Sequence, residues 1–450
     1  MGSSSDRPIA VDLFAGAGGL SLGFEQAGFD VVAAVEVDPV HCAVHKFNFP
    51  DCAVIPKSVA DVSAGDVRLA SGIGNKNIDV VFGGAPCQGF SLIGQRVLDD
   101  PRNSLVLEFV RLVAELNSSY FVFENVKGLT VGKHRQFLYE LITEFEKRGY
   151  AVKTPWQVLN ASHYGVPQNR ERLILIGAKQ GLPLPEYPQP YTRTAGSKKG
   201  ILAESPTCYE ALNDLPNADE FEILKTQDWV KLPQKAWGKP SDYARLMRCM
   251  DDDSWFFGYK REWNPKILTS SIQTNHSDIS RRRFLETQPG EVEKISRFLK
   301  LPPAGVSNTL RAGTDAARGA FTSPRPIHYK YPRCITVREM ARLHGFPDWF
   351  RLHETKWHGA RQVGNAVPVP LARAVATELM QAMGIMPSRP SHTQKLGDDK
   401  LILMDMSVAA KYWDVPVPIS QRDRKSGVTK RSQVETEAER ILELVASGKI

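Results

Sequence analysis

Short apolar segments alternate with helical patterns through the first 180 residues, and this alternation limits the fold more than any other feature of the sequence. Each apolar segment has the length of a buried strand, and the helical segments repeat apolar residues every three or four positions. The expected strands are Ile9–Phe14, Val31–Val35, a short segment near Val54, Ile78–Phe82 and Tyr120–Phe123. The expected helices are Leu20–Ala27, Asn103–Leu116 and Phe137–Phe145. Strands that alternate with helices build a mostly parallel sheet, so the sequence predicts an α/β fold.

A glycine-rich turn, Ala15–Gly19, follows the first strand and opens the first helix. Such a turn lets a ligand pack against backbone amides. Glu36 lies 20 positions beyond Gly16, where an acidic residue would hold a ribose in a nucleotide-binding fold. Ser21 replaces the third glycine of the dinucleotide fingerprint, so a nicotinamide oxidoreductase is only the runner-up. Phe14, directly before the turn, suits a site that stacks a ring or covers a sulfonium.

Two more acidic residues follow later strands. Asp61 comes after the short segment near Val54 and is a candidate for contact with an adenine edge. Asp38 is better explained as a solvated loop residue.

A lone cysteine, Cys87, follows the strand Ile78–Phe82 on the loop Gly83-Gly84-Ala85-Pro86-Cys87-Gln88-Gly89. Loops at the carboxyl ends of strands carry ligands and chemistry in open α/β sheets. Proline restricts the backbone there, and glycines allow a bound partner to come close. The loop alone fits either a nucleophile or a buried structural cysteine.

Glu124 stands where the strand Tyr120–Phe123 ends, so a parallel sheet brings it to the same edge as Cys87. A cysteine and a carboxylate in one cleft suggest a nucleophile and an acid. Arg170 and Arg172 point to the same side if the chain there is extended. They could hold a phosphate or a base carbonyl, or pair with acids on a solvated rim. Two late strands, Val152–Leu159 and Arg172–Ile176, are joined by a short loop and could form an antiparallel hairpin at one sheet edge.

Composition restricts the partners of the protein. The formal net charge of +7 and the pI of about 9.0 permit a polyanionic partner. The six cysteines include no C-x-x-C pair, which argues against zinc and a disulfide scaffold and for a reducing cytosol. No apolar run approaches the roughly 18 residues of a membrane span, and the N-terminus has no signal-peptide pattern. We therefore expect a cytoplasmic protein without a metal or a membrane partner.

The composition of the sequence changes at Pro183, where several prolines and Gly196–Gly200 suggest a domain boundary. Residues 196–330 are rich in turns, with tryptophans among basic residues. Between His276 and Arg333 there are 11 Lys or Arg and 5 Asp or Glu. The run Arg281-Arg282-Arg283 is either a solvated face or a phosphate contact.

Two helices are expected beyond this irregular segment, Arg338–His344 and Pro368–Met383, and the second would pack back against the first sheet. Pro387–Asp399 has the composition of a linker, and Glu435–Ala446 of a helix.

Six stretches, in this order, together resemble the DNA cytosine carbon-5 methyltransferases. Asp12–Gly19 is similar to the S-adenosylmethionine turn of that family, Pro86-Cys87-Gln88 to its nucleophile motif, and Glu124-Asn125-Val126 to its acid motif. Gln168–Arg172 is similar to the Q-x-R-x-R motif, Arg338–Pro347 to a late helical motif, and Gln362–Pro368 to the closing motif. Thr309–Gly313 resembles a short motif of the recognition segment. The likeness runs from about Ile9 to about Met383.

The resemblance implies a Rossmann-like sheet with helices on both faces that binds S-adenosylmethionine, and a smaller, irregular, β-rich target-recognition domain. The implied domains are residues 1–195 with 351–385 for catalysis, 196–350 for recognition, and a C-terminal extension, 386–450, of unknown role. The implied catalytic residues are Cys87, Glu124, Arg170 and Arg172. The implied cofactor residues are Phe14, Gly16, Ala17, Gly19, Glu36, Val37, Asp61, Val62, Pro86, Leu105, Asn365 and Val367. The implied DNA contacts are Gln88, Ser91, Arg96, Arg281, Arg282, Arg283 and Arg311.

By the same resemblance, the reaction starts when the Cys87 thiolate adds to carbon 6 of a cytosine rotated out of duplex DNA. Protonated Glu124 would hold ring nitrogen 3, and the arginines would steady the base carbonyl and the nearby loop. Residues Ser91–Arg102 would close the site, unless they form an ordinary surface loop. The expected partners are double-stranded DNA and a cognate restriction endonuclease, and the expected state is a monomer.

Two alternatives stay open at this point. One is a similar enzyme that acts on transfer RNA, although the Cys-Phe-Thr tripeptide of that branch is absent. The other is a non-catalytic DNA-binding protein on the same fold, which would not need to keep Cys87 and Glu124 together.

Overall fold

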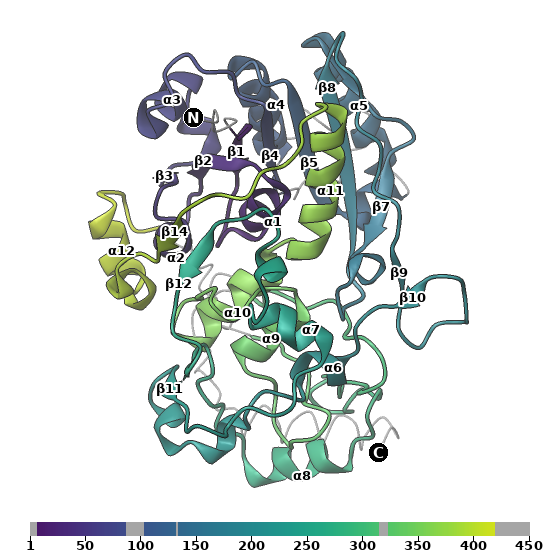
Figure 1. Ribbon diagram of the computed structural model, residues 1–450, viewed down its shortest axis with the longest axis vertical. Helices are drawn as coiled ribbons and strands as arrows, with labels where there is room; N and C mark the ends of the chain where they lie inside the picture. The colour runs from purple at the N-terminus through teal and green to yellow at the C-terminus, as the bar shows by residue number, and fades with distance from the viewer. Residues whose placement is uncertain (1–6, 87–102, 132–133, 315–322, 419–450) are drawn as a thin grey trace, which may run out of the picture.

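The computed structural model describes residues 7–86, 103–131, 134–314 and 323–418. A central sheet and its helices form the upper part of the molecule in Figure 1, and a less regular part lies below them. None of the helices in these ranges has the length and apolar character that crossing a bilayer would require.

The central sheet is mostly parallel, which confirms the predicted α/β fold. Its strands lie in the order β3-β2-β1-β4-β5-β8-β6, and β7 also pairs with β8. The parallel strands are β1 (Ile9–Leu13), β2 (Asp30–Val35), β3 (Ala53–Ile55), β4 (Val80–Gly83) and β5 (Tyr120–Val126). The antiparallel strands are β6 (Tyr150–Val152), β7 (Gln157–Asn160) and β8 (Glu171–Lys179).

The late hairpin differs from its prediction in two respects. Its strands are antiparallel as expected, but β8 lies inside the sheet, between β5 and β6. The single strand expected at 152–159 is two strands, and Pro155, which has no backbone N–H, lies in the break between them.

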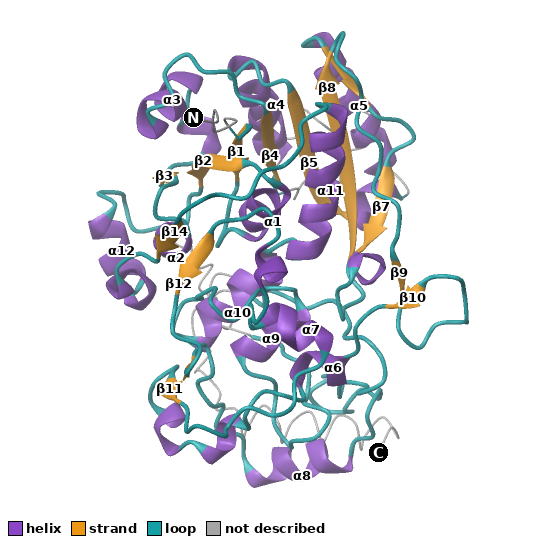
Figure 2. Cartoon of the chain, viewed as in Figure 1, coloured by secondary structure: helices purple, strands orange, loops and turns teal. Residues whose placement is uncertain are grey.

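Helices cover both faces of the sheet (Figures 1 and 2). Successive residues of β1 point to opposite faces, so Ala10 packs on one side while Val11 and Leu13 pack on the other. Helices α4 (Ser104–Glu115) and α5 (His134–Lys147) cover the side of Val11. Helices α1 (Gly19–Ala27) and α11 (Val369–Ala382) cover the side of Ala10 and pack against each other. The expected return of the late helix to the first sheet is therefore found. Helices α2 (Pro39–Asn48) and α3 (Ala64–Ser71) flank β2 and β3.

The lower part of the molecule is irregular rather than β-rich. Its strands have only two or three residues each: β9 (Thr192–Arg193), β10 (Ala203–Glu204), β11 (Val230–Lys231), β12 (Lys260–Glu262) and β13 (Ile267–Leu268). Its helices are α6 (Cys208–Leu212), α7 (Asp242–Met247), α8 (Asp278–Glu286), α9 (Val337–Leu343) and α10 (Lys356–Asn365).

Buried arginines replace sheet hydrogen bonds as the framework of this part. Arg342, which is fully buried, binds Asp214 and Asp348 at 3.0 and 2.6 Å. Arg333 makes two hydrogen bonds of 2.8 Å to Glu339. Side chains that donate several hydrogen bonds can hold an irregular backbone, which explains why few strands are needed here.

The segment after residue 385 contacts the protein through one strand and one helix, in contrast to a free linker. Strand β14 (Thr393–Lys395) runs parallel to β12, and α12 (Met406–Tyr412) packs on α2. The helix expected at 435–446 falls outside the described residues.

Candidate active site

A cavity of about 780 Å³ opens at the carboxyl ends of the parallel strands. Three groups of residues line it: the turn after β1 with the residues after β2, the ends of β4 and β5, and the segment at the end of α10. The lining residues used below are Phe14, Gly16, Ala17, Gly19, Glu36, Val37, Asp38, His41, Gly84, Ala85, Pro86, Glu124, Asn125, Arg170, Arg172, Arg361, Gln362, Asn365, Val367 and Pro418. The volume is within the usual range for a cofactor-sized ligand.

The turn after β1 brings strained backbone to the cavity. Phe14 has a φ of 62°, a left-handed conformation that non-glycine residues rarely adopt. Gly19 faces the closing segment so closely that a Cβ there would lie 2.7 Å from the carbonyl oxygen of Val367. The turn and the segment 365–367, far apart in sequence, therefore form one wall of the cavity.

Glu36 is fixed at the second wall by backbone donors on both sides. Its Oε2 accepts a hydrogen bond of 2.8 Å from the Gly16 amide, and its Oε1 accepts one of 2.8 Å from the Asp38 amide. The carboxylate keeps lone pairs that can accept further donors, such as the two hydroxyls of a ribose.

Asp38 lines the same wall, which corrects its interpretation as a solvated loop residue. Its side chain caps α2 by accepting from the amides of Val40 and His41. Burial raises the pKa of Asp38, but His41 and these amides outweigh it, so the pKa is lowered overall. The sequence signal for this role was the Asp-Pro pair, a cap residue followed by proline at the first helical position.

Glu124, on β5, faces Arg172 on the neighbouring β8. The two side chains are about one-eighth exposed, and Arg172 Nε lies 2.8 Å from Glu124 Oε1. Burial raises the pKa of Glu124 above its usual value, although Arg172 and Arg170 oppose the shift. Gly84 leaves room for this carboxyl, because a Cβ there would lie 2.5 Å from Glu124 Oε2.

Arg170 has a different environment from Arg172, although both line the cavity. Its side chain is buried, and its guanidinium donates to the carbonyl oxygens of Leu310 at 2.9 Å and of Gly364 and Ala366 at 2.8 Å. These contacts join the segment before β8 to the recognition segment and to the closing motif. These three hydrogen bonds of Arg170 go to backbone, and its expected role at the base carbonyl and the nearby loop stays a prediction.

The segment that leads to the cysteine loop is held by Asn125. Its Nδ2 donates a hydrogen bond of 2.8 Å to the carbonyl oxygen of Ala85, and Pro86 lines the cavity next to it. The motif Glu124-Asn125-Val126 by itself gives no sign of this hydrogen bond. Cys87, Gln88, Ser91 and Arg96 lie outside the described residues.

Nine of the twelve predicted cofactor residues line the cavity and three do not. Asp61 is exposed in a short 3₁₀ helix, η1 (Val59–Asp61). Val62 is buried, and its carbonyl oxygen accepts from Arg111 at 2.9 Å. Leu105 is half-buried on α4. His41, Arg361 and Gln362 also line the cavity, although none was among the predicted cofactor residues. Gln362 belongs to the stretch that is similar to the closing motif, whereas nothing in the local sequence distinguishes His41 and Arg361 from residues of an ordinary helix.

A buried polar chain lies beneath the turn. Ser21 Oγ is 2.6 Å from Asp12 Oδ2 and 3.1 Å from His45 Nε2, and all three side chains are buried. Burial raises the pKa of Asp12 to about 8 and lowers that of His45 to about 3. Both groups are therefore largely uncharged near neutral pH, as their apolar surroundings require.

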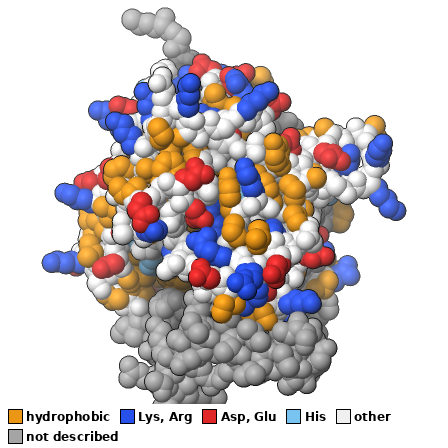
Figure 3. Space-filling model, turned by 90° about the horizontal axis from the view of Figure 1, so that it is seen from below, with side chains coloured by type: hydrophobic (Ala, Val, Ile, Leu, Met, Phe, Trp, Pro, Cys, Tyr) orange, Lys and Arg blue, Asp and Glu red, His pale blue; other side chains and the backbone are white. Residues whose placement is uncertain are grey.

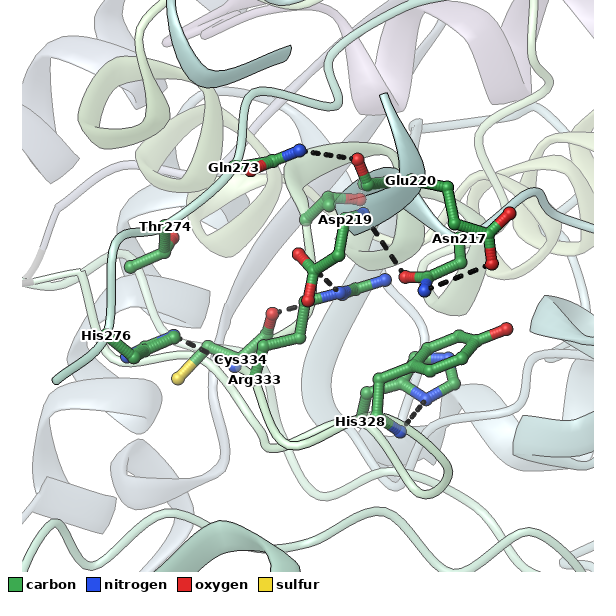
Figure 4. Close-up of polar contacts among 12 residues, drawn as sticks. Asn217, Asp219, Glu220, Gln273, Thr274, His276, His328, Arg333 and Cys334 are labelled. Atoms are coloured by element: carbon green, nitrogen blue, oxygen red, sulfur yellow. Dashed lines mark hydrogen bonds and ion pairs between the residues drawn. The ribbon is translucent and has the colours of Figure 1, made fainter. Parts of the chain in front are cut away.

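The arginine run on α8 is mostly engaged inside the molecule. Arg281 lies 3.2 Å from Asp219, and Arg283 lies 3.3 Å from Glu293, whereas Arg282 is exposed. Asp219 also lies 3.6 Å from Arg333, so it joins α8 to the buried framework (Figure 4). Arg311 is exposed as well. On the lower face of the molecule, basic and acidic side chains are interspersed (Figure 3).

Comparisons with known proteins show the family to which the chain belongs. A model of the family described as C-5 cytosine-specific DNA methylase matches residues 10–381. The type II methyltransferase M.XorII of Xanthomonas oryzae pv. oryzae is 57% identical over 416 residues, which cover 92% of this chain and 95% of that protein. The type II methyltransferase M1.HphI of Haemophilus parahaemolyticus is 32% identical over 82% of this chain and 86% of its own.

A solved structure resembles the chain over most of its length. It is a putative DNA modification methyltransferase encoded within a prophage of E. coli, with a TM-score of 0.67 and 31% identity. The match covers 84% of this chain and 99% of that one. The DNA enzyme is thus supported over the transfer RNA alternative, and the chain belongs to the C-5 cytosine-specific DNA methylase family and is a DNA cytosine-5 methyltransferase.

Proposed function

We propose that the cavity binds S-adenosylmethionine and that Cys87 and Glu124 act together on a cytosine rotated out of duplex DNA. The observation that carries this proposal is the common opening: Glu36 on one side and Glu124 on the other line a single cavity. Gly84, Ala85 and Pro86 line it too, and Cys87 is the next residue along the chain.

The residues of one wall suit the methyl donor. Glu36 is held by the amides of Gly16 and Asp38 and can accept the ribose hydroxyls, while Phe14 can cover the sulfonium region. When bound, S-adenosylmethionine supplies an electrophilic methyl group. Asp61, Val62 and Leu105 stay predicted cofactor contacts, although they are not among the residues that line the cavity.

Glu124 has the properties of the acid that the reaction needs. Its raised pKa keeps a larger protonated fraction than an exposed glutamate has, and a protonated carboxyl can donate to ring nitrogen 3 of cytosine. Arg172 orients that carboxyl through Oε1 and leaves Oε2 toward Gly84. As nitrogen 3 is protonated, carbon 6 becomes open to addition of the Cys87 thiolate. Carbon 5 then has the electron density to take the methyl group, and loss of its proton releases Cys87.

In this proposal, Arg170 is a positioning residue. It fastens Leu310 of the recognition segment and Gly364 and Ala366 of the closing motif to the start of β8, next to Arg172. We propose that residues 196–350 read the target sequence, and that residues 1–195 and 351–385 carry catalysis.

The names of the relatives suggest a biological setting. Because these relatives are named type II methyltransferases, we propose that the chain is the modification enzyme of a restriction–modification pair, with double-stranded DNA as substrate and a cognate endonuclease as partner. Bisulfite sequencing of DNA from expressing cells would locate the methylated cytosine. Unmethylated cytosines throughout would contradict this setting.

The decisive experiment is covalent trapping. Duplex DNA with 5-fluorocytosine at the target should capture the protein, because fluorine cannot leave carbon 5 as a proton does. Cys87→Ser should abolish both trapping and turnover, since a hydroxyl is far less ionised than a thiol near neutral pH. Cys249→Ser is the matched control, and it should trap like the wild type. Near-normal methylation by Cys87→Ser would place the nucleophile elsewhere.

A further inference from the structure

The segment 393–418, which we call the C-terminal strap, lies beyond residue 381, where the match to the family ends. It is nevertheless attached to the fold at several places. In Figure 1 it runs beside α2 and β12 as the yellow end of the described chain. Its strand β14 pairs with β12, and the Gly397 amide donates a hydrogen bond of 2.8 Å to the carbonyl oxygen of Phe47 near the end of α2.

The strap also contacts the other end of α2. Helix α12 packs along α2, and the indole Nε1 of Trp413 donates a hydrogen bond of 3.1 Å to the carbonyl oxygen of Pro39, the first residue of α2. Five residues later, Pro418 lines the cavity of the active site. The strap therefore runs along α2 from one end to the other and reaches the cavity.

The start of α2 is directly coupled to the proposed donor site. Pro39 follows Asp38, whose amide holds Glu36 Oε1 at 2.8 Å. The thiol of Cys42, one turn into α2, donates to the carbonyl oxygen of Glu36 at 3.2 Å. A displacement of the first turn of α2 would therefore move the Glu36 carboxylate.

A second connection runs through His353. Its Nε2 lies 3.0 Å from the carbonyl oxygen of Met404 in the strap, and its amide donates to Gln362 Oε1 at 3.0 Å. Gln362 lines the cavity on the side of the closing motif. The strap therefore contacts residues that hold two walls of the cavity: Pro39 next to the wall of Glu36, and His353 next to the wall of Gln362.

We propose that the C-terminal strap positions the walls of the methyl-donor site, with Trp413 as the positioning residue for Glu36. This inference rests on the proposed function, because it assumes that the cavity takes S-adenosylmethionine. It assigns a role in donor affinity to a segment whose role the sequence left open.

The test measures donor affinity and turnover in the full-length protein. Calorimetry with S-adenosylhomocysteine should give a dissociation constant about fivefold higher for Trp413→Ala, the size of one lost hydrogen bond. Trp413→Phe, which keeps a ring but not the N–H, should show a smaller rise. The KM for the methyl donor should rise with the dissociation constant, while kcat at saturating donor and the KM for DNA stay unchanged. Lys411→Ala, an exposed change on the same helix, is the matched control.

The outcomes distinguish a failure of the strap proposal from a failure of the proposed donor site. If wild-type protein binds S-adenosylhomocysteine and Glu36→Ala weakens it, the donor site stands. If Trp413→Ala and Pro418→Gly then bind as the wild type does, the strap proposal is overturned. Should Trp413→Ala fail to fold, Pro418→Gly, which alters only the residue at the cavity, decides in its place. Failure of wild-type binding, or no effect of Glu36→Ala, would count against the donor site itself.

Discussion

Arg170→Ala should lower the unfolding free energy of the protein rather than remove a catalytic group. The Arg170 guanidinium donates three hydrogen bonds of 2.8 to 2.9 Å, to Leu310, Gly364 and Ala366. All three acceptors are backbone carbonyls, and the arginine itself is 1% exposed. Its removal leaves the carbonyls of Leu310 and Gly364 without this donor in the place where three distant segments meet. The Ala366 carbonyl oxygen keeps a second partner, His344 Nε2, at 2.9 Å.

The magnitude follows from the carbonyls of Leu310 and Gly364. A buried polar group that loses its partner costs about 1–3 kcal/mol, so two should cost roughly 2–6 kcal/mol of unfolding free energy. Water that enters the vacated space would bring the value toward the lower end. Arg170→Lys should recover only part of the loss, because an ammonium group cannot reproduce the planar fork of guanidinium.

Arg172→Ala is the matched comparison. Arg172 makes one ion pair, with Glu124, and that carboxyl can take up a proton when the arginine is removed. Its unfolding free energy should therefore change by less than about 1.5 kcal/mol, whereas methyl transfer should slow at least about tenfold as Glu124 loses its orientation.

Urea unfolding followed by tryptophan fluorescence, and incorporation of labelled methyl groups into duplex DNA, measure the two quantities separately. An Arg170→Ala protein that unfolds within about 1 kcal/mol of the wild type but transfers no methyl groups would refute the reasoning. Arg170 would then have to act on the base itself.

Three further predictions concern the space beside Glu124, the buried Asp12 and the exposed Arg282. Gly84→Ala should slow methyl transfer at least about tenfold in steady-state assays, because the new Cβ would displace Glu124; an unchanged rate would show that the carboxyl can relocate freely. The wild type should lose stability as pH rises from about 4 toward 8, by up to about 1.4 kcal/mol per pH unit, because unfolded Asp12 releases a proton that the native state, with its pKa of about 8, retains. Asp12→Asn should remove that dependence from denaturation curves, and parallel curves for the two proteins would contradict it. Arg282→Ala should lower the salt slope of DNA binding by roughly 0.9, as one lost phosphate contact does, whereas Arg281→Ala should act mainly on stability; equal slopes for wild type and Arg282→Ala would make Arg282 a solvated residue.

The local sequence was sufficient to predict the sheet and the edge where the site lies. Apolar strands that alternate with helices can form a mostly parallel sheet, and the carboxyl ends of parallel strands share one edge. That geometry brings Glu36, Glu124 and the segment before Cys87 together without further information. The glycine turn was equally readable, because its backbone conformation depends on the residue types within it.

Side-chain roles that depend on distant segments were decided only by the tertiary structure. Arg170 and Arg172 are two positions apart, yet one binds carbonyls more than 130 residues away and the other binds Glu124 on the neighbouring strand. Asp61 is acidic and follows a strand, but the fold leaves it exposed and outside the lining of the cavity.

The same limit applies to charge and to the C-terminal strap. A run of three arginines does not reveal that acids elsewhere in the chain bind two of them, Arg281 and Arg283. The composition of residues 387–399 also does not show that a strand in this segment pairs with β12, 133 residues earlier in the chain. Periodicity and residue type determine which elements form, because those depend on near neighbours. Which side chains meet depends on how the elements pack, and in this protein that decided which arginine binds Glu124 and which binds distant backbone carbonyls.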